Sequence, residues 1–222
     1  MTDLIPVTVL VVAKAPVAGL AKTRLAASIG AAAAADVAAA ALLDTLDAVA
    51  ATPVAERVVA CTGNLDDAAR AEEIRQRLAS FTVVTQRGDG FAERLVNAHS
   101  DAFASSHPVL QIGMDTPQVT PALLGTCARQ LLTSAAVLGM AADGGWWVLG
   151  VSAAATAACL REVPMSRSDT GALTLAALRS AGADVSLLPE LADVDTIDDV
   201  ESVRRACGPA TRFARVAATV GV

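Results

Sequence analysis

The sequence predicts an α/β fold with three layers, in which helices cover both faces of a mostly parallel central sheet. Short apolar runs alternate with longer helical patterns along the chain, and this alternation is typical of the strand–helix–strand units that build parallel sheets. The first apolar run is almost free of polar residues, as expected for a strand that is buried on both faces. No linker or repeat divides the 222 residues, so we expect a single domain over residues 1–222.

Each strand is predicted from a short run rich in Val, Leu, Ile and Ala. In chain order the predicted strands are Val7–Ala13, Arg57–Cys61, Phe81–Thr85, Val109–Gly113, Ala136–Met140, Trp146–Val151 and Val185–Leu188. The stretches between them carry apolar residues at helical spacing, and the longest is dominated by alanine, the residue with the highest helix propensity. The predicted helices are Thr23–Val49, Asp66–Ala79, Phe91–Ser105, Pro121–Leu132, Gly171–Ser180 and Ile197–Ala206. The pattern is least clear from Gly208 to Val222, where we assign no element.

Composition and charge argue against two classes of protein. Hydrophobic residues make up 54% of the chain, but no run of about 18 uncharged apolar residues is present to cross a bilayer. The nearest candidate, Ile29–Ala51, carries three aspartates and is interpreted as an alanine-rich helix of a soluble protein. The net charge of −6 and the lack of a basic tract argue against nucleic acid as a partner.

The N-terminus and the cysteines favour a cytoplasmic location. The start Met1-Thr2-Asp3 lacks the basic and cleavage-site features of a signal peptide. The four cysteines show no Cys-x-x-Cys spacing and are interpreted as small core residues in a reducing compartment. The sequence leaves a homodimer open.

A basic loop, residues 14–25, joins the first predicted strand to the first helix. It contains Lys14, Gly19, Lys22, Thr23 and Arg24. Backbone N–H groups and the positive end of a helix dipole attract phosphate at such a position, and the cations add charge. The loop matches neither the P-loop spacing nor the G-x-G-x-x-G dinucleotide motif. We interpret these five residues as a place to hold phosphates; a solvated surface loop is the alternative.

Three aspartates form a candidate metal site. Asp115 follows the fourth predicted strand, and Asp193 and Asp195 lie two apart in an extended segment, so that their side chains point to the same side. Carboxylates suit a hard divalent cation such as Mg²⁺ or Mn²⁺. For Asp115 the alternative is a turn residue before a helix. Thr196 and Asp199 have the spacing of a capping box, which favours a structural role for Asp199.

Two further segments are candidates for ligand contacts. Gln86 ends the third predicted strand in a glycine-containing loop, where it could contact a nucleobase. Ser168 and Thr170 precede a predicted helix, where they could bind an anionic acceptor. For these two hydroxyls, simple capping of the helix is the alternative.

The segment Asp143-Gly144-Gly145 is the last candidate. Two glycines allow close approach of the backbone to a ligand, and Asp143 could bind a metal or orient an acceptor or sugar hydroxyl. The alternative is a tight turn between two strands, for which Asp-Gly is a common signal.

These motifs together resemble a known family. The segment Lys14-Ala15-Pro16-x-x-Gly19-x-x-Lys22-Thr23-Arg24-Leu25 is similar to the opening motif of bacterial glycosyltransferase-A-fold proteins labelled glycosyltransferases or nucleotide-diphospho-sugar transferases. Other blocks of that family are matched, in the same order, by Gln86-x-x-Gly-Asp89-Gly-x-x-Glu93-Arg94, Gly113-x-Asp115-Thr116-Pro117, Asp143-Gly144-Gly145 and Asp193-Val194-Asp195-Thr196. The family is similar to the 2-phospholactate/phosphoenolpyruvate guanylyltransferases and, more distantly, to molybdenum-cofactor nucleotidyltransferases.

The resemblance implies a glycosyltransferase-A type of fold and a metal-dependent transferase. It implies that Asp115 holds a catalytic Mg²⁺ or Mn²⁺, that Asp193 or Asp195 completes the metal site, and that the cations of the basic loop hold nucleotide phosphates. Asp115, Lys22 and Asp143 form the expected catalytic set, and Gly144, Gly145, Ser168 and Thr170 the expected acceptor site.

Three functions fit this resemblance. The first is glycosyl transfer from a nucleotide-sugar to a small-molecule acceptor, which in its inverting form needs a general base; Asp143 and Asp169 are the candidates. The second is nucleotidyl transfer from an NTP to a phosphorylated acceptor, with release of pyrophosphate. The third is nucleotide binding without catalysis.

Overall fold

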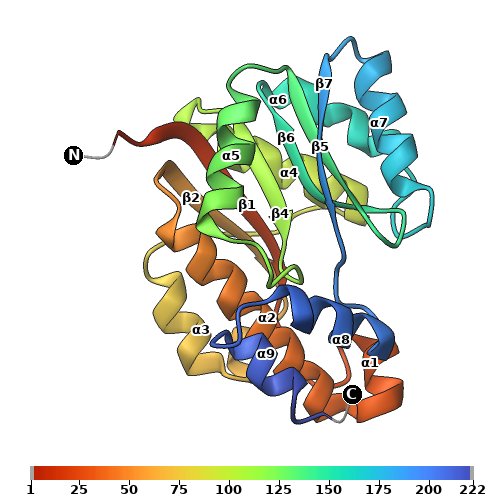
Figure 1. Cartoon of the computed structure of the whole chain (residues 1–222). Coiled ribbons are helices and arrows are strands. Elements are labelled where there is room, and N and C mark those ends of the chain that lie inside the picture. Colours follow the sequence, from red (N-terminus) through yellow and green to blue (C-terminus); the bar gives the residue numbers. More distant parts are fainter. Residues whose placement is uncertain (1–2, 221–222) are drawn as a thin grey trace.

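The structure is a computed structural model that describes residues 3–220 (Figure 1). All seven predicted strands are present, and they form one sheet. The strands are β1 (Ile5–Lys14), β2 (Val54–Thr62), β3 (Thr82–Thr85), β4 (Val109–Gly113), β5 (Ala136–Ala141), β6 (Trp146–Val151) and β7 (Val185–Leu191). Their order in the sheet is β3-β2-β1-β4-β6-β5-β7. Only β6 among them is antiparallel to its neighbours, which confirms the mostly parallel sheet.

The sheet topology determines where a ligand can bind. The chain passes from β1 outward through β2 to β3, then returns to place β4 on the other side of β1. In parallel sheets the crevice at such a reversal, beyond the carboxyl ends of the strands, is the usual ligand site. Here those ends are Lys14 on β1 and Gly113 on β4. The residue that follows each strand is therefore positioned at the candidate site.

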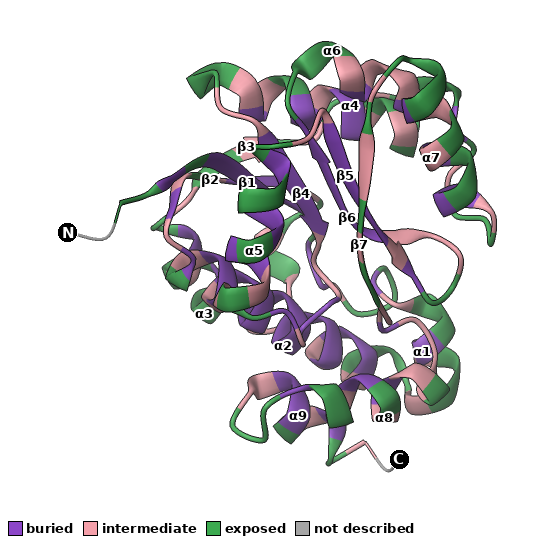
Figure 2. Cartoon of the chain, turned by 45° about the horizontal axis from the view of Figure 1, so that its top comes forward, coloured by how far each residue is buried: buried purple, intermediate pink, exposed green. Residues whose placement is uncertain are grey.

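Helices cover both faces of the sheet, which confirms the three-layer arrangement. They are α1 (Thr23–Ile29), α2 (Ala31–Ala51), α3 (Ala71–Leu78), α4 (Phe91–Ala102), α5 (Pro121–Leu131), α6 (Ala154–Ala157), α7 (Thr170–Ser180), α8 (Ile197–Ala206) and α9 (Arg212–Ala217). The buried side chains of α2, α3 and α5 form one core with the sheet, and those of α4, α6 and α7 form a second core on the opposite face. Figure 2 shows the buried strands between these layers.

A third core lies away from the sheet. In it α1, α8 and α9 pack against α2, and Leu25 and Phe213 are among its fully buried side chains. Figure 1 shows the C-terminal helices, in blue, beside the orange α2. Two distant parts of the chain therefore meet at the start of α1, where the basic loop ends.

The structure differs from the predicted elements in three ways. Of the predicted helix Asp66–Ala79, only Ala71–Leu78 is α-helix, and a 3₁₀ turn at Leu65–Asp67 precedes it. The predicted helix Thr23–Val49 is interrupted at Gly30, whose φ of 84° and ψ of 155° are not helical, so α1 and α2 are separate. Helices α6 and α9 were not predicted. Within residues 3–220, no helix has the length and apolar character that a membrane span requires.

Candidate active site

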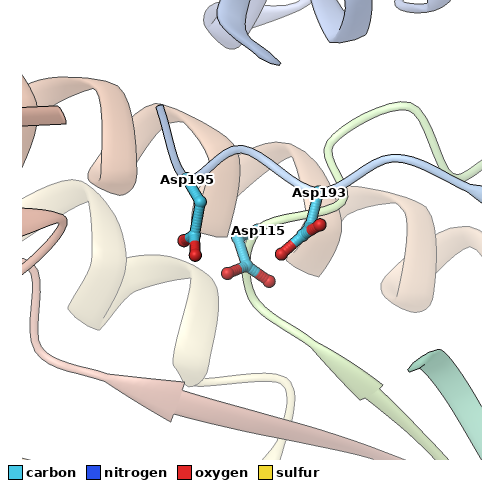
Figure 3. A group of neighbouring side chains, drawn as sticks. All are labelled: Asp115, Asp193 and Asp195. Atoms are coloured by element: carbon cyan, nitrogen blue, oxygen red, sulfur yellow. The ribbon is translucent and has the colours of Figure 1, made fainter. Parts of the chain in front are cut away.

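The structure brings the three predicted aspartates together in a carboxylate cluster (Asp115, Asp193 and Asp195; Figure 3). One carboxylate oxygen of each residue lies within 4.8 Å of those of the other two. Asp115 follows β4, whereas Asp193 and Asp195 follow β7. A backbone hydrogen bond from Val194 N to Asp115 O, 3.2 Å long, joins the two segments. Figure 3 shows the carboxylates of Asp115 and Asp193 directed toward one another.

The start of α8 holds the second segment of the cluster in place. One oxygen of Asp199, Oδ2, accepts hydrogen bonds from Asp195 N at 3.1 Å and from Thr196 N at 2.7 Å. The capping box between Thr196 and Asp199 is present, which confirms the predicted structural role of Asp199. These bonds fix the backbone on which Asp193 and Asp195 are carried.

Lys22 lies inside the carboxylate cluster. Its Nζ donates to Asp115 Oδ2 at 2.6 Å and to Asp195 Oδ1 at 2.7 Å, and its side chain is 12% exposed. Burial alone would lower the pKa of Lys22, but the two carboxylates outweigh it and raise the pKa well above its usual value. Arg24, 71% exposed, reaches only Asp195, at 3.3 Å. Lys22 is thus the principal cation of the cluster.

Asp193 is the carboxylate that Lys22 does not contact. Its side chain makes no hydrogen bond or ion pair within the part of the chain that the structure describes. Burial first, and then the charges of Asp115, Asp143 and Asp195, raise the pKa of Asp193 to about 6 against the opposing charge of Lys22. The cluster therefore carries more negative charge than its own cations balance.

A cleft of about 650 Å³ runs across the carboxyl ends of the strands and includes the carboxylate cluster. One half is lined from the side of β1, β2 and α4, by residues that include Lys14, Gln86 and Arg94. The other half is lined from the side of β5, β6 and α7, by residues that include Asp143, Trp146 and Ser168. Volumes of this order are those of small-molecule sites.

A second cavity of about 460 Å³ adjoins the same carboxylates. Its lining contains all three cations of the basic loop, together with Thr23, Asp115 and Asp195. Lys14 donates through Nζ to Leu20 O at 2.7 Å, which holds the loop in a turn. The basic loop thus places its positive charge beside the cluster: Lys14 and Arg24 line both cavities, and Lys22 lines the second.

Several predicted ligand residues have structural contacts of their own. The Gln86 side-chain amide donates to Ala13 O at 2.8 Å and to Ala60 O at 2.9 Å, which leaves its oxygen for the cleft. Gly19, with a φ of 79°, forms the exposed turn of the basic loop and lines neither cavity. Thr170 lines the main cleft, but its hydroxyl donates to Pro164 O at 2.9 Å.

The first of the two glycines after Asp143 is explained by close packing. A Cβ at Gly144 would lie 1.8 Å from Ser168 O, and Gly171 N donates to Gly144 O at 2.8 Å. The turn between β5 and β6 therefore lies directly against the start of α7. Asp143 accepts from Gly145 N at 2.7 Å through one oxygen and lines the main cleft.

Sequence reasoning missed Gln111 on β4. Its side chain is 3% exposed, lines the cleft, and has an oxygen with no hydrogen-bond partner among the described residues. Behind it lies His99 of α4, which is fully buried. Burial lowers the pKa of His99 to about 4, although the Gln111 side chain opposes this shift. A glutamine within an otherwise apolar strand was the available signal.

The sheet order and the helices on both faces define an α/β fold of the nucleotide-diphospho-sugar transferase type, and the carboxylate cluster lies at its β1–β4 reversal. The chain belongs to the family described as "Uncharacterized protein conserved in bacteria (DUF2064)", whose model matches residues 45–167. No curated protein matches the chain. The family match includes Asp115 and Asp143 but neither the basic loop nor the other two carboxylates of the cluster.

Solved structures agree on the fold. A protein from Desulfovibrio desulfuricans G20, provisionally named a nucleotide-diphospho-sugar transferase, is 24% identical with a TM-score of 0.84; the alignment covers 95% of this chain and 93% of that one. Rv0371c from Mycobacterium tuberculosis H37Rv, in complex with manganese, is 21% identical with a TM-score of 0.56 (89% and 97% covered). CMP:2-keto-3-deoxy-manno-octonic acid synthetase, in complex with CTP, is 15% identical with a TM-score of 0.54 (90% and 97% covered). These similarities confirm the predicted type of fold.

Proposed function

We propose that this protein is a divalent-metal-dependent transferase that moves a glycosyl group from a nucleotide-sugar to a small-molecule acceptor. The observation that carries the proposal is the main cleft, which runs past the carboxylate cluster with space on both sides of it. A donor nucleotide would lie on the side of β1 and β2, and the acceptor on the side of β6 and α7. The carboxylates would lie between the two, at the reacting bond.

The carboxylate cluster fits Mg²⁺ or Mn²⁺ on its own chemistry. Three carboxylates offer hard oxygen ligands within 4.8 Å of one another. A cation is already held there in another form, because the Lys22 ammonium lies between Asp115 and Asp195. A bound divalent ion would neutralise charge on the phosphate oxygens of the donor. The manganese complex of Rv0371c is consistent with this choice of metal.

The chain's own residues would bind and orient the two substrates. On the donor side, the free oxygen of Gln86 can accept from a base, and Arg24 is exposed for a phosphate. On the acceptor side, Asp143 accepts from Gly145 N through one oxygen, and its other oxygen could take the acceptor proton. Asp169 is less suited as a base because Arg167 holds both of its oxygens at 2.9 Å.

Nucleotidyl transfer is the second candidate, and one observation favours it. The second cavity is lined by Lys14, Lys22 and Arg24 and adjoins the carboxylates. Three cations beside a metal site suit the β- and γ-phosphates of an NTP and a leaving pyrophosphate. The CTP complex of the CMP:2-keto-3-deoxy-manno-octonic acid synthetase, a protein of the same fold, is consistent with this reading.

The test is a panel of NTPs and nucleotide-sugars with Mg²⁺ or Mn²⁺, read by thermal shift and then by product analysis. A ligand that binds only the folded state raises the melting temperature. We expect a metal-dependent shift with a nucleotide-sugar, followed by release of its nucleoside diphosphate when the acceptor is supplied. A shift with an NTP and release of pyrophosphate would support the second candidate instead. If nucleotide binds without metal and no turnover follows, the function would be nucleotide binding without catalysis.

A further inference from the structure

We infer that Lys22 is the resident cation of the carboxylate cluster, and that a divalent metal can bind there only by displacing its ammonium into the neighbouring basic cavity. The inference rests on the proposed function, because it takes the cluster to be a metal site. It goes further by assigning two positions to the Lys22 side chain. Before metal binding the ammonium contacts the carboxylates, and after metal binding it lies in the neighbouring basic cavity.

The contacts of Lys22 place it where a metal would lie. Its Nζ is 2.6 Å from Asp115 and 2.7 Å from Asp195, and these carboxylates supply two of the three candidate ligands. Mg²⁺ binds carboxylate oxygens at about 2.0–2.1 Å. An ammonium and a divalent ion placed between the same two carboxylates would lie close together and would repel each other strongly. The two cations therefore exclude one another.

The choice of residue supports the inference. Only two of the 17 basic residues in the sequence are lysines, Lys14 and Lys22, and both lie in the basic loop. An ammonium is a compact point charge on a flexible stem, whereas a guanidinium is a planar fork that binds a carboxylate bidentately. A compact charge resembles a metal ion, can fit between two carboxylates, and can leave without movement of the backbone.

The displaced ammonium has a place to go. Lys22 also lines the second cavity, together with Lys14 and Arg24. The three cations would repel one another there unless an anion joined them. A phosphate group in that cavity would be such an anion, so the metal and the phosphates of a nucleotide should each favour the binding of the other.

The first experiment measures Mn²⁺ affinity without nucleotide, by electron paramagnetic resonance titration, in wild type, Lys22→Met and Lys14→Met. We expect Lys22→Met to bind Mn²⁺ at least about tenfold more tightly than wild type. The variant lacks the ammonium that competes with the metal for the carboxylates through charge-assisted hydrogen bonds. Lys14→Met is the matched control, since its ammonium contacts a carbonyl and no carboxylate of the cluster, and its Mn²⁺ affinity should change less than about twofold.

A second variant guards against a folding defect. Lys22 has a left-handed backbone, with φ 47° and ψ 50°, which glycine adopts without strain. Lys22→Gly therefore removes the ammonium and relieves the backbone, and it should show the same gain in Mn²⁺ affinity. Circular dichroism and thermal melting establish that both variants are folded.

The outcomes separate the inference from the proposed function. If wild type binds Mn²⁺ neither alone nor with the nucleotides of the panel, the metal site itself is wrong and the inference falls with it. If wild type binds Mn²⁺ and folded Lys22→Met and Lys22→Gly bind it no more tightly, Lys22 is not a competitor and only the inference is overturned. If both variants gain and Lys14→Met does not, the inference stands.

A direct view of the ammonium adds a second readout. With ε-labelled lysine, NMR should give two side-chain signals, assigned with the Lys14→Arg variant. We expect the Lys22 NH₃⁺ protons to exchange slowly with water in metal-free protein and rapidly once Mg²⁺ is bound. Unchanged slow exchange in Mg²⁺-saturated protein would overturn the displacement.

Discussion

Asp44 and the aspartates of the carboxylate cluster have opposite surroundings. Asp44 of α2 is 8% exposed, and its carboxylate accepts from Arg212 N at 3.1 Å and from Phe213 N at 2.7 Å, at the start of α9. The Asp44 carboxylate therefore has hydrogen-bond donors that compensate its charge. In the carboxylate cluster three acidic side chains converge on one another, and Lys22 contacts only two of them.

The difference separates a carboxylate that holds the fold together from carboxylates that await a ligand. A buried acid with matched donors stabilises the structure, and breaking the match is costly. Converging acids with too few donors lower stability, and such an arrangement is typical of functional sites. Removing the carboxylate of Asp44 should therefore lower stability, and removing a carboxylate of the cluster should lower activity.

The largest expected effect is on activity. Asp115→Asn should lower kcat by about 10³-fold or more, because a carboxylate ligand of the proposed metal is lost where charge develops. The melting temperature should stay within a few degrees of wild type. The transfer assay identified by the ligand panel measures the first quantity, and thermal unfolding the second.

The control for that variant lies close to the cluster. Asp198 is exposed in the first turn of α8, so Asp198→Asn removes a similar charge without touching the cluster and should keep nearly full activity. If Asp115→Asn retained the activity of this control, the metal assignment would be wrong.

The next effect is on stability. Asp44→Ala leaves two backbone N–H groups of the α9 start without this acceptor, one buried and one partly buried. We expect a loss of about 3 kcal/mol in the free energy of unfolding. Urea titration measures it. The folded fraction should turn over normally, because Asp44 lies outside both cavities. The control is Asp66→Ala, which removes an ion pair with Arg75 from a side chain that is 75% exposed and should cost less than about 1 kcal/mol.

His99 extends the comparison to a buried base that lacks partners. Neither of its ring nitrogens has a hydrogen-bond partner among the described residues, and its pKa falls from 6.5 to about 4. The unfolded chain therefore binds a proton at a higher pH than the folded chain does. Stability that is fully present above pH 6.5 is lost progressively as the pH falls to 4, by up to about 3 kcal/mol.

His99→Leu should remove this part of the pH dependence. Urea titrations at pH 7, 5.5 and 4.5 would give a smaller loss of unfolding free energy on acidification than wild type, with aspartate and glutamate titration common to both. An equal loss in the two proteins would mean that His99 is protonated in the folded state with a suitable partner.

The sequence predicts the parts of this molecule that depend on local pattern. Strands β4 (Val109–Gly113) and β6 (Trp146–Val151) begin and end as predicted, because short apolar runs bounded by turn residues specify a buried strand. The placement of Asp115 also follows from local pattern, since the carboxyl ends of parallel strands meet at one edge of the sheet.

Other parts depend on contacts across long separations. Helix α9 is short and carries no strong pattern, and its first turn is held by Asp44, 168 and 169 positions away. The position of the Lys22 ammonium depends on partners 93 and 173 positions away. The basic loop predicts a cation for phosphates, but no local pattern indicates that two carboxylates hold it first.

Gly30 joins the region of the carboxylate cluster to the region of Asp44. Its substitution has the smallest expected effect on stability and tests whether the two regions are independent. It connects α1, which begins next to Lys22, to α2, which carries Asp44. Its φ of 84° and ψ of 155° belong to a region that is nearly exclusive to glycine. No atom lies within 4 Å of a Cβ added there, so Gly30→Ala adds backbone strain alone. We expect a loss of about 2 kcal/mol in unfolding free energy.

The Mn²⁺ affinity of Gly30→Ala decides where that strain goes. Leu25 anchors α1 in the third core with no exposed surface, so the strain should stay at Gly30 and leave Lys22 in place. Stability should fall while Mn²⁺ affinity stays at the wild-type value, and Gly208→Ala, at a glycine with an ordinary φ, should change neither. If Gly30→Ala had wild-type stability and an altered Mn²⁺ affinity, α1 would have moved to relieve the strain and carried Lys22 with it. Gly30 would then couple the cluster to the region of Asp44 instead of separating them.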